Sequence, residues 1–462
     1  MNNITDPYLD KQKIDEIYQY ALKTLAEIGV GCPSHKAIDI LKEKTKITHK
    51  NDRIYFNQQE LDEYFQKRKL NIRSDKDDME FEIVSHWSMF EICDPITNMP
   101  RAATEKEAID MARLTEQLGA KNCPIPVSCG DVPPVLRTLE AEKIGLIYTK
   151  HHSGRLTATN FSEIRYLIDM NQACGRKYKL ALEGLISPLK FNERVFDVYF
   201  EFYQQEDVDI EIFTAIPMAG ATAPLVFPAN LVQVLAEGIA LDFVFNILSD
   251  GKHNYFGLRL DPFDFKSANI VFGSPQWCLF HKALKELWKG LIGDENIYGS
   301  FRTNARNVDG QALIERTGSF LFQAVMGVRK FSAVGQISID EVFSPVQAML
   351  DLEILKYVKG LCQSYPFIDS DILSIIKEGI EQKEFISSKT TVENFRSMFD
   401  MSMMSTADNL NTWRAKGSRD LQAVAWEAAQ KLINDYSYEL DSDKRKDVEL
   451  IYAKCKKYIQ QQ

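Results

Sequence analysis

The chain has 462 residues, of which 45% are hydrophobic and 26% are charged. These values are typical of soluble globular proteins and exclude collagen-like, disordered and low-complexity classes. The 55 Lys and Arg residues against 65 Asp and Glu residues give a formal charge of −10, which argues against nucleic acid or an anionic membrane as the main partner.

The N-terminal region, residues 1–75, is expected to be a mostly helical segment. Apolar residues recur at helical spacing over residues 11–30, which predicts an amphipathic helix. Shorter helices are expected at residues 35–43 and 58–67, with a short strand at residues 53–56 between them. The first residues contain no apolar signal core, so a cytoplasmic protein is expected.

The most apolar stretch of the chain covers residues 231–248. Gln233, Glu237 and Asp242 interrupt it, so it is expected to be a buried helix and not a membrane span. The eight cysteines form no CxxC pairs, which favours free thiols in a reducing cytoplasm over a disulfide framework.

Residues 76–344 alternate between short apolar runs and helical segments. The expected strands cover residues 89–93, 123–127, 155–159, 179–183, 209–214, 253–257, 297–301 and 330–334. The expected helices cover residues 104–118, 137–150, 162–174, 193–205, 228–246, 276–289 and 309–326, and one more follows Ser344. Such alternation calls for parallel strands joined by right-handed crossovers. Eight units predict an α/β fold of the TIM (β/α)8 barrel type, with a doubly wound sheet as the alternative.

The C-terminal region, residues 345–462, has helical apolar spacing with many charges between the apolar positions. It is expected to be a helical addition packed on the barrel with solvated charged faces. A docking surface for another protein is the alternative.

Four sequence strings together carry a family resemblance. They are PITNMPRAATEKEA at residues 95–108, DVPPVLRTLEAEKIGLIYTKH at 131–151, PMAGATAPLVFPANLVQVLAE at 217–237 and FGSPQW at 272–277. With these strings the chain resembles the trimethylamine methyltransferase family over roughly residues 10–435. The resemblance implies a TIM barrel that removes one methyl group from an amine. It also implies that the methyl group goes to the cobalt of a corrinoid (a cobalamin) held on a separate, cognate protein.

One segment differs from the trimethylamine-specific branch of that family. That branch carries pyrrolysine after a stretch similar to SDAKxxDAQ, whereas the matching residues 303–311 here read TNARNVDGQ. The resemblance therefore points to the branch without pyrrolysine, whose members are similar to glycine betaine methyltransferases. A small quaternary amine such as glycine betaine is the expected substrate.

A quaternary amine needs little chemical help to lose a methyl group. It already carries a full positive charge, so its leaving group departs as a neutral tertiary amine without a general acid or a Lewis acid. Positioning and electrostatics are expected to supply most of the catalysis. No residue is therefore assigned a catalytic role from the sequence.

The active site of a TIM barrel lies at the carboxyl ends of its strands. Residues at the expected strand ends are the candidates for substrate binding. They are Asp131, Asn160, Glu183, Met218, Tyr255, Phe256, Tyr298, Phe301, Arg302 and Gln336. The aromatic members of this set would attract a quaternary ammonium through the ring quadrupole. Because side chains alternate along a strand, only one of each adjacent pair is expected to face the pocket.

Two charged positions suit the two ends of a betaine. Glu183 lies in the run LALEG, where its carboxylate would offset the ammonium charge; pairing with a neighbouring arginine or lysine is the alternative. A substrate carboxylate calls for an arginine that binds it bidentately. Arg302 is preferred over Arg259 and Arg306 because it lies closest to its strand end.

No metal site is expected from the seven histidines and eight cysteines, which form no HExxH or CxxC motif. Cys123 and Cys129 are interpreted as small core residues. Two other functions stay open. One is a metal-dependent barrel methyltransferase that acts on another methyl donor, and the other is a non-catalytic barrel that only binds a betaine. The oligomeric state, a homo-oligomer included, is left open.

Overall fold

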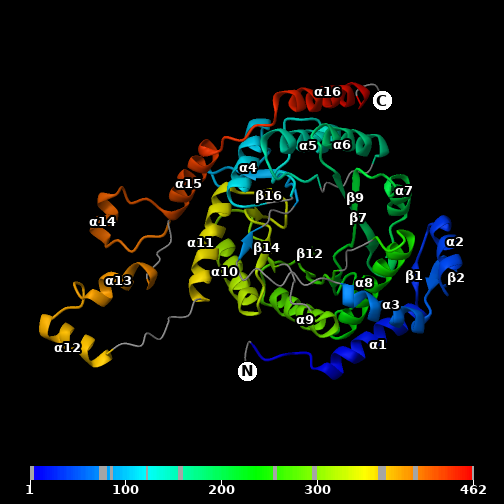
Figure 1. Cartoon of the computed structure of the whole chain (residues 1–462), viewed down its shortest axis with the longest axis horizontal. Helices are drawn as coiled ribbons and strands as arrows, with labels where there is room; N and C mark the ends of the chain where they lie inside the picture. Colours follow the sequence, from blue (N-terminus) through cyan, green and yellow to red (C-terminus); the bar gives the residue numbers. More distant parts are fainter. Residues whose placement is uncertain are drawn as a thin grey trace.

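The computed structural model describes residues 5–71, 81–83, 87–120, 123–154, 160–252, 257–293, 299–362, 371–398 and 404–459. The fold is mixed α/β, as the alternation of apolar runs and helical segments predicts. Figure 1 shows helices α4 (Glu105–Gln117) to α11 (Pro345–Leu361) arranged as a ring around inner strands, among them β7 (Tyr178–Ile186) and β9 (Val208–Thr214).

The N-terminal region joins the main body through both a helix and a strand. Its elements are α1 (Lys11–Glu27), β1 (Val30–Gly31), α2 (His35–Lys44), β2 (Thr48–Lys50), β3 (Arg53–Tyr55) and α3 (Gln58–Asn71). The three predicted helices and the strand at residues 53–56 are confirmed, whereas β1 and β2 were not predicted. Helix α1 packs against α8 (Ala229–Leu248), and β1 pairs in parallel with β8 (Lys190–Phe191).

The helices of the ring begin and end close to the predicted positions. Besides α4, α8 and α11, they are the 3-10 turn η1 (Pro134–Leu136), α5 (Arg137–Tyr148), α6 (Phe161–Ala173), α7 (Glu193–Phe202), α9 (Pro275–Ile292) and α10 (Gly310–Val325). Several begin at a side chain that caps the first turn, such as Thr104 for α4, Ser274 for α9 and Asp309 for α10. Helix α11 also contacts α4, so the two ends of this series of helices meet.

The remaining strands are short. They are β4 (Glu82–Ile83), β5 (Glu91–Cys93), β6 (Pro100–Arg101), β10 (Met218–Ala219), β11 (Asp261–Asp264), β12 (Asn269–Ile270), β13 (Gly299–Ser300), β14 (Lys330–Ser332), β15 (Gln336–Ile337) and β16 (Val342–Phe343). Within the described ranges the strands form four sheets, and none of these sheets closes on itself. Parallel pairs nevertheless predominate among the inner strands: β7 with β9, β10 with β11, β13 with β14, β14 with β4, and β16 with β5.

One predicted strand differs from what the structure describes, and three others lie wholly or partly outside the described residues. Residues 123–127 make only isolated parallel bridges, from Val127 to Met89 and from Cys123 to His152. The predicted strand at 155–159 and most of the one at 253–257 lie outside the described residues, as do residues 297 and 298.

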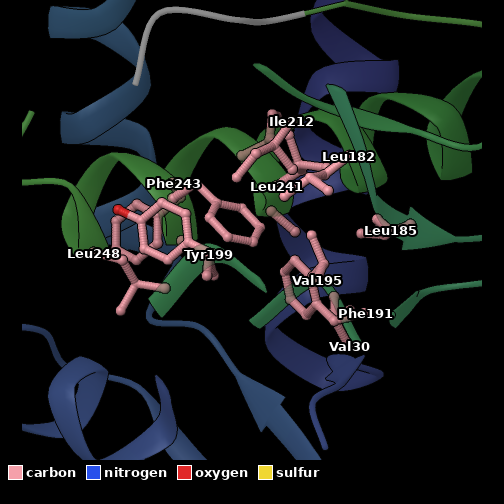
Figure 2. Close-up of a cluster of buried hydrophobic side chains, with 14 of the residues drawn as sticks. Val30, Leu182, Leu185, Phe191, Val195, Tyr199, Ile212, Leu241, Phe243 and Leu248 are labelled. Atoms are coloured by element: carbon pink, nitrogen blue, oxygen red, sulfur yellow. The ribbon is translucent and has the colours of Figure 1, made fainter. Parts of the chain in front are cut away.

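The larger hydrophobic core lies between the β7–β9 pair, α8 and the N-terminal helices. Figure 2 shows Leu182 of β7 and Ile212 of β9 beside Leu241 of α8, with Phe243 and Tyr199 nearby. A second core joins α4, α10 and α11 and includes the buried rings of the phenylalanines that follow β13 and lie in α10 and β14.

Helix α8 is long and apolar enough to cross a membrane, but 78% of its apolar window is buried inside the protein. Its two buried carboxylates have partners there. Asp242 lies 3.0 Å from Arg68 of α3, and Glu237 accepts hydrogen bonds from the Ser187 hydroxyl and the Leu189 backbone. The prediction of a buried helix is confirmed, and α8 is a core helix.

The C-terminal region is helical, as expected. It contains α12 (Ile372–Gln382), α13 (Lys389–Met398), α14 (Leu410–Ala415), α15 (Leu421–Asp435) and α16 (Ser442–Ile459). Helix α15 packs on α11 and α4, and α16 packs on α5 and α6. Figure 1 shows α12 and α13 lying away from the ring. The expected domain boundaries at residues 75 and 344 stay a prediction.

Candidate functional site

The paired strands β7 and β9 have one apolar face and one face turned to the interior of the ring. Leu182 is the register partner of Ile212, and both pack toward α8. The next pair, Glu183 and Phe213, must face the other way because side chains alternate along a strand. Gly184 again faces α8, since a Cβ there would lie 2.4 Å from Ile212. Glu183 is exposed on this inner face, although it lies in the middle of the fold.

Aromatic rings surround this inner face. The Phe213 and Trp87 ring centroids lie 5.8 Å apart, with planes inclined by 43°. The Arg259 guanidinium lies 5.2 Å from the Phe213 centroid, within the range of a cation–π contact. The side-chain amide of Gln336 donates a 3.1 Å hydrogen bond to the Trp87 carbonyl oxygen. Segments from four distant parts of the chain therefore meet around Phe213.

A second group of charged residues lies at the end of β13. Arg302 Nε lies 2.7 Å from Asp340 Oδ2, and the two side chains keep 12% and 21% of their surface exposed. The guanidinium also lies 4.9 Å from the centroid of the Phe272 ring. Burial raises the pKa of Asp340; the Arg302 charge opposes that rise and the Asp261 charge adds to it.

An unusual backbone turn holds Asp340 in this position. Ser338, Ile339 and Asp340 have φ values of 56°, 59° and 65°, so three consecutive residues other than glycine adopt the left-handed conformation. Each such residue costs roughly 1–2 kcal/mol, and a β-branched isoleucine is especially uncommon there. Backbone hydrogen bonds from Ser338 to Ala305 and from Ile339 to Thr303 tie the turn to the segment after Arg302. Strain of this kind concentrates at functional sites.

Asp261 connects this pair to a further predicted residue. Its register partner across the β10–β11 ladder is Met218, and His281 Nε2 of α9 lies 3.3 Å from its carboxylate. The ring centroids of His281 and Trp277 are 3.8 Å apart. The structure thus brings two predicted residues, Met218 and Arg302, to one region through Asp261 and Asp340. It brings two others, Glu183 and Gln336, to a second region through Phe213 and Trp87.

Three predicted residues occupy structural positions. Asn160 caps α6, where its side chain accepts a hydrogen bond from the Ser162 backbone N–H. Asp131 is exposed and accepts a 3.2 Å hydrogen bond from the Glu105 backbone N–H. Phe301 is fully buried with its ring stacked on Phe320 at 4.6 Å, so it faces the core and leaves the set of residues that we place around the interior.

The other aromatic candidates, Tyr255, Phe256 and Tyr298, lie outside the described residues.

Several residues of these groups were not nominated from the sequence, among them Trp87, Phe213, Asp261 and Asp340. A signal existed for Phe213, because it stands one residue before the end of the predicted strand at residues 209–214. Asp340 carried no signal, because its turn contains no glycine to mark a left-handed backbone.

Six of the eight cysteines are buried, whereas Cys123 is partly buried and Cys362 is exposed. All eight are free. Burial raises the pKa of Cys93 and Cys278 to about 11 and that of Cys129 to about 12, so these side chains are protonated thiols at neutral pH. Over the described part of the chain, no group of three or more His, Cys, Asp or Glu side chains is arranged to hold a metal ion.

Aromatic rings and a half-buried Arg–Asp pair inside a ring of helices suit a protein that binds a small charged molecule. Residues 3–459 match the family model described as trimethylamine methyltransferase (MTTB). Since this match covers nearly the whole chain, the protein belongs to the trimethylamine methyltransferase family.

Curated relatives agree with this assignment. A trimethylamine methyltransferase of Methanosarcina mazei is 27% identical over 247 residues, which are 52% of this chain and 49% of the relative. Those of Methanosarcina thermophila and Methanosarcina barkeri are 24% and 26% identical over 239 and 249 residues, which are 51% and 53% of this chain and 49% of each relative. The chain spans about half the length of the curated relatives it matches.

Proposed function

We propose that the protein is a methyltransferase that moves a methyl group from a small quaternary amine, such as glycine betaine, to the cobalt of a corrinoid carried by a separate cognate protein. The observation that carries the activity is the family match over residues 3–459. The choice of a quaternary amine rests on residues 303–311, which contain only ordinary amino acids where the trimethylamine branch has pyrrolysine.

The reaction is a displacement at carbon. The bond between the methyl carbon and nitrogen breaks with its electron pair left on nitrogen, and the amine departs neutral. The reduced cobalt of the partner supplies the electron pair for the new bond to carbon. The protein has no proton to move in this step, so its own residues bind, orient and desolvate the amine.

Arg302 is the proposed partner of the substrate carboxylate. Its Nε faces Asp340, and a guanidinium has two further nitrogens that together match a carboxylate. Asp340 and the Phe272 ring limit the orientations of the guanidinium. Met218, Glu183 and Gln336 are retained as proposed binding residues, and no metal ion bound directly to the chain takes part.

The same proposal includes a closed TIM barrel. It is supported by the parallel pair β13–β14, which joins the last two expected strands of the barrel, by the parallel pair of β14 with β4, a strand shortly before the first expected strand, and by the contact of α11 with α4. A cytoplasmic location is part of the proposal because the partner corrinoid must be reduced to react. A homo-oligomer is left open.

Methyl transfer to free cob(I)alamin tests the activity. Purified protein is mixed with chemically reduced cobalamin and with glycine betaine, carnitine, choline or trimethylamine, and the absorbance of methylated cobalamin is followed. We expect methylation with a betaine. Transfer from trimethylamine alone would contradict the substrate class, and no transfer from any amine would contradict the activity. Stoichiometric zinc in an active sample would instead favour the metal-dependent alternative.

A further inference from the structure

We propose that Trp87, Phe213 and Glu183 form a binding site for an organic cation that bears methyl groups, and that this site receives the ammonium end of the substrate. The choice of substrate rests on the proposed function. The cation site itself rests on the contacts of these residues.

The site has two aromatic walls and one negative charge. The ring centroids of Trp87 and Phe213 are 5.8 Å apart and the ring planes are inclined by 43°, so the two rings are tilted against each other and do not stack. Glu183 is the register partner of Phe213, and its exposed carboxylate projects from the same face of the sheet. No cation of the described residues pairs with Glu183. Aromatic faces and a nearby carboxylate are the chemistry that recognises quaternary ammonium groups.

The protein already holds a cation at this place. Arg259 lies with its guanidinium 5.2 Å from the Phe213 centroid. Phe213 keeps only 3% of its surface exposed, and this guanidinium is one of the groups that lie against its ring. In our proposal the ammonium group of the ligand replaces this guanidinium over the ring, and Arg259 moves aside.

Gln336 provides an independent sign that a ligand group belongs here. It is 1% exposed, and its amide nitrogen bonds to the Trp87 carbonyl oxygen. Its side-chain oxygen is buried and has no hydrogen-bond partner in the described part of the structure. A buried acceptor without a partner is costly. The methyl groups of a quaternary ammonium carry partial positive charge and offer weak C–H donors to such an oxygen.

Arg259 and Asp261 link the cation site to the region of Arg302. Arg259 contacts Phe213, and Asp261, two residues further on, acts on Asp340, the partner of Arg302. Two residues of extended chain span about 7 Å at most. In our proposal the ammonium group of the ligand lies at Phe213 and its carboxylate lies at Arg302.

Binding of tetramethylammonium chloride, which has no carboxylate, tests the site without any corrinoid. Isothermal titration calorimetry would compare the wild type with Phe213→Leu, Glu183→Gln and Arg259→Met, with sodium chloride as the reference salt. We expect the first two variants to bind about five- to tenfold more weakly, because each loses one attraction for the cation. We expect Arg259→Met to bind more tightly, because a competing positive charge is gone.

Two variants serve as matched controls. Phe243→Leu changes a buried ring on the α8 side of the same core, and Glu206→Gln removes an exposed charge just before β9. Both should bind like the wild type. If Phe213→Leu fails to fold, Glu183→Gln carries the test, because Glu183 is exposed.

Three results would overturn the cation site: no binding of tetramethylammonium to the wild type, unchanged binding in the variants at positions 183 and 213, or weaker binding in Arg259→Met. These results are independent of methyl transfer. Binding with the expected pattern but no transfer from any amine would leave the site standing and remove the proposed function. Methyl transfer from a betaine without the expected changes in tetramethylammonium binding would support the proposed function and contradict the cation site.

Discussion

Two arginine–aspartate pairs lie close together in this fold and differ in what surrounds them. Arg316 and Asp351 are 2.6 Å apart with both side chains fully buried. Arg302 and Asp340 are 2.7 Å apart but keep 12% and 21% of their surface exposed. The first pair is enclosed by protein groups, and the second is open on one side. Only the second can exchange a protein partner for a ligand.

The hydrogen bonds around the buried pair support this distinction. Asp351 also accepts bonds from the Gly335 backbone N–H and the Gln347 side chain, and Arg316 donates to the Gln336 carbonyl oxygen. Burial raises the pKa of Asp351 and lowers that of Arg316, so the low-dielectric surroundings oppose the charges that these bonds stabilise. The buried pair orients Gln336 and the segment before the left-handed turn.

The largest effect should come from breaking the buried pair. Arg316→Met leaves the Asp351 charge buried without its partner, so we expect the free energy of unfolding to fall by about 3–5 kcal/mol. Urea denaturation followed by circular dichroism measures this loss. The double variant Arg316→Met, Asp351→Leu should recover part of it. If Arg316→Met were as stable as the wild type, the buried pair would be no more important for stability than the open pair.

Breaking the open pair should affect ligand binding more than stability. Arg302→Met should lower the affinity for glycine betaine about tenfold, because a bidentate charge-assisted contact is lost. The free energy of unfolding should fall by only about 1 kcal/mol, because the pair is partly solvated. Calorimetric titration and denaturation measure the two effects. The control is Arg306→Met, which replaces an exposed arginine on the same segment. If both variants lost the same affinity for glycine betaine, Arg302 would no longer be assigned to the substrate carboxylate.

A capping residue should affect stability alone. Asn160→Ala removes the hydrogen bond to the first turn of α6, and we expect a loss of about 1 kcal/mol in the free energy of unfolding. Asn192→Ala, which removes the equivalent cap of α7, should cost a similar amount. Affinity for tetramethylammonium and glycine betaine should not change. Weaker binding in Asn160→Ala alone would return Asn160 to the substrate-binding set.

The smallest effect should be the pH dependence of the open pair. The folded-state pKa of Asp340 is raised, so its carboxyl is easier to ionise in the unfolded chain. The quantity to follow is the unfolding free energy of the wild type minus that of Asp340→Asn. This difference should be greatest below about pH 4, should decrease as the pH rises through the Asp340 pKa, and should then level off. Denaturation at several pH values measures the difference. A rise with pH would show that Arg302 outweighs burial.

The helices of this fold were predictable from the sequence because their apolar positions repeat with the helical period. Helix α8 was predicted at residues 228–246 and covers Ala229–Leu248, and its three polar interruptions correctly indicated a buried helix. The short strands were less predictable. The strands β1 and β2 contain too few residues to show any alternation, so nothing in the sequence distinguished them from turns.

The site was harder to predict than the helices. Position at a strand end found Glu183, Gln336 and Arg302, but it could not tell which of two adjacent residues faces inward. Phe301 shows the difficulty: its direction is set by packing on Phe320, which is distant in sequence. The contact of Trp87 with Phe213 joins segments that no local pattern relates. The binding roles of the predicted residues stay predictions until ligand binding is measured.

The parallel pair of β16 with β5 joins residues about 250 positions apart in the chain. A ribosome that adds about 5–20 residues per second needs about 12–50 s to make the intervening segment. During that time β5 lacks its later partner β16, and this edge of β5 is free to pair with other chains. We therefore expect the nascent protein to depend on chaperones until residue 343 has emerged, and fragments that end before this point to aggregate.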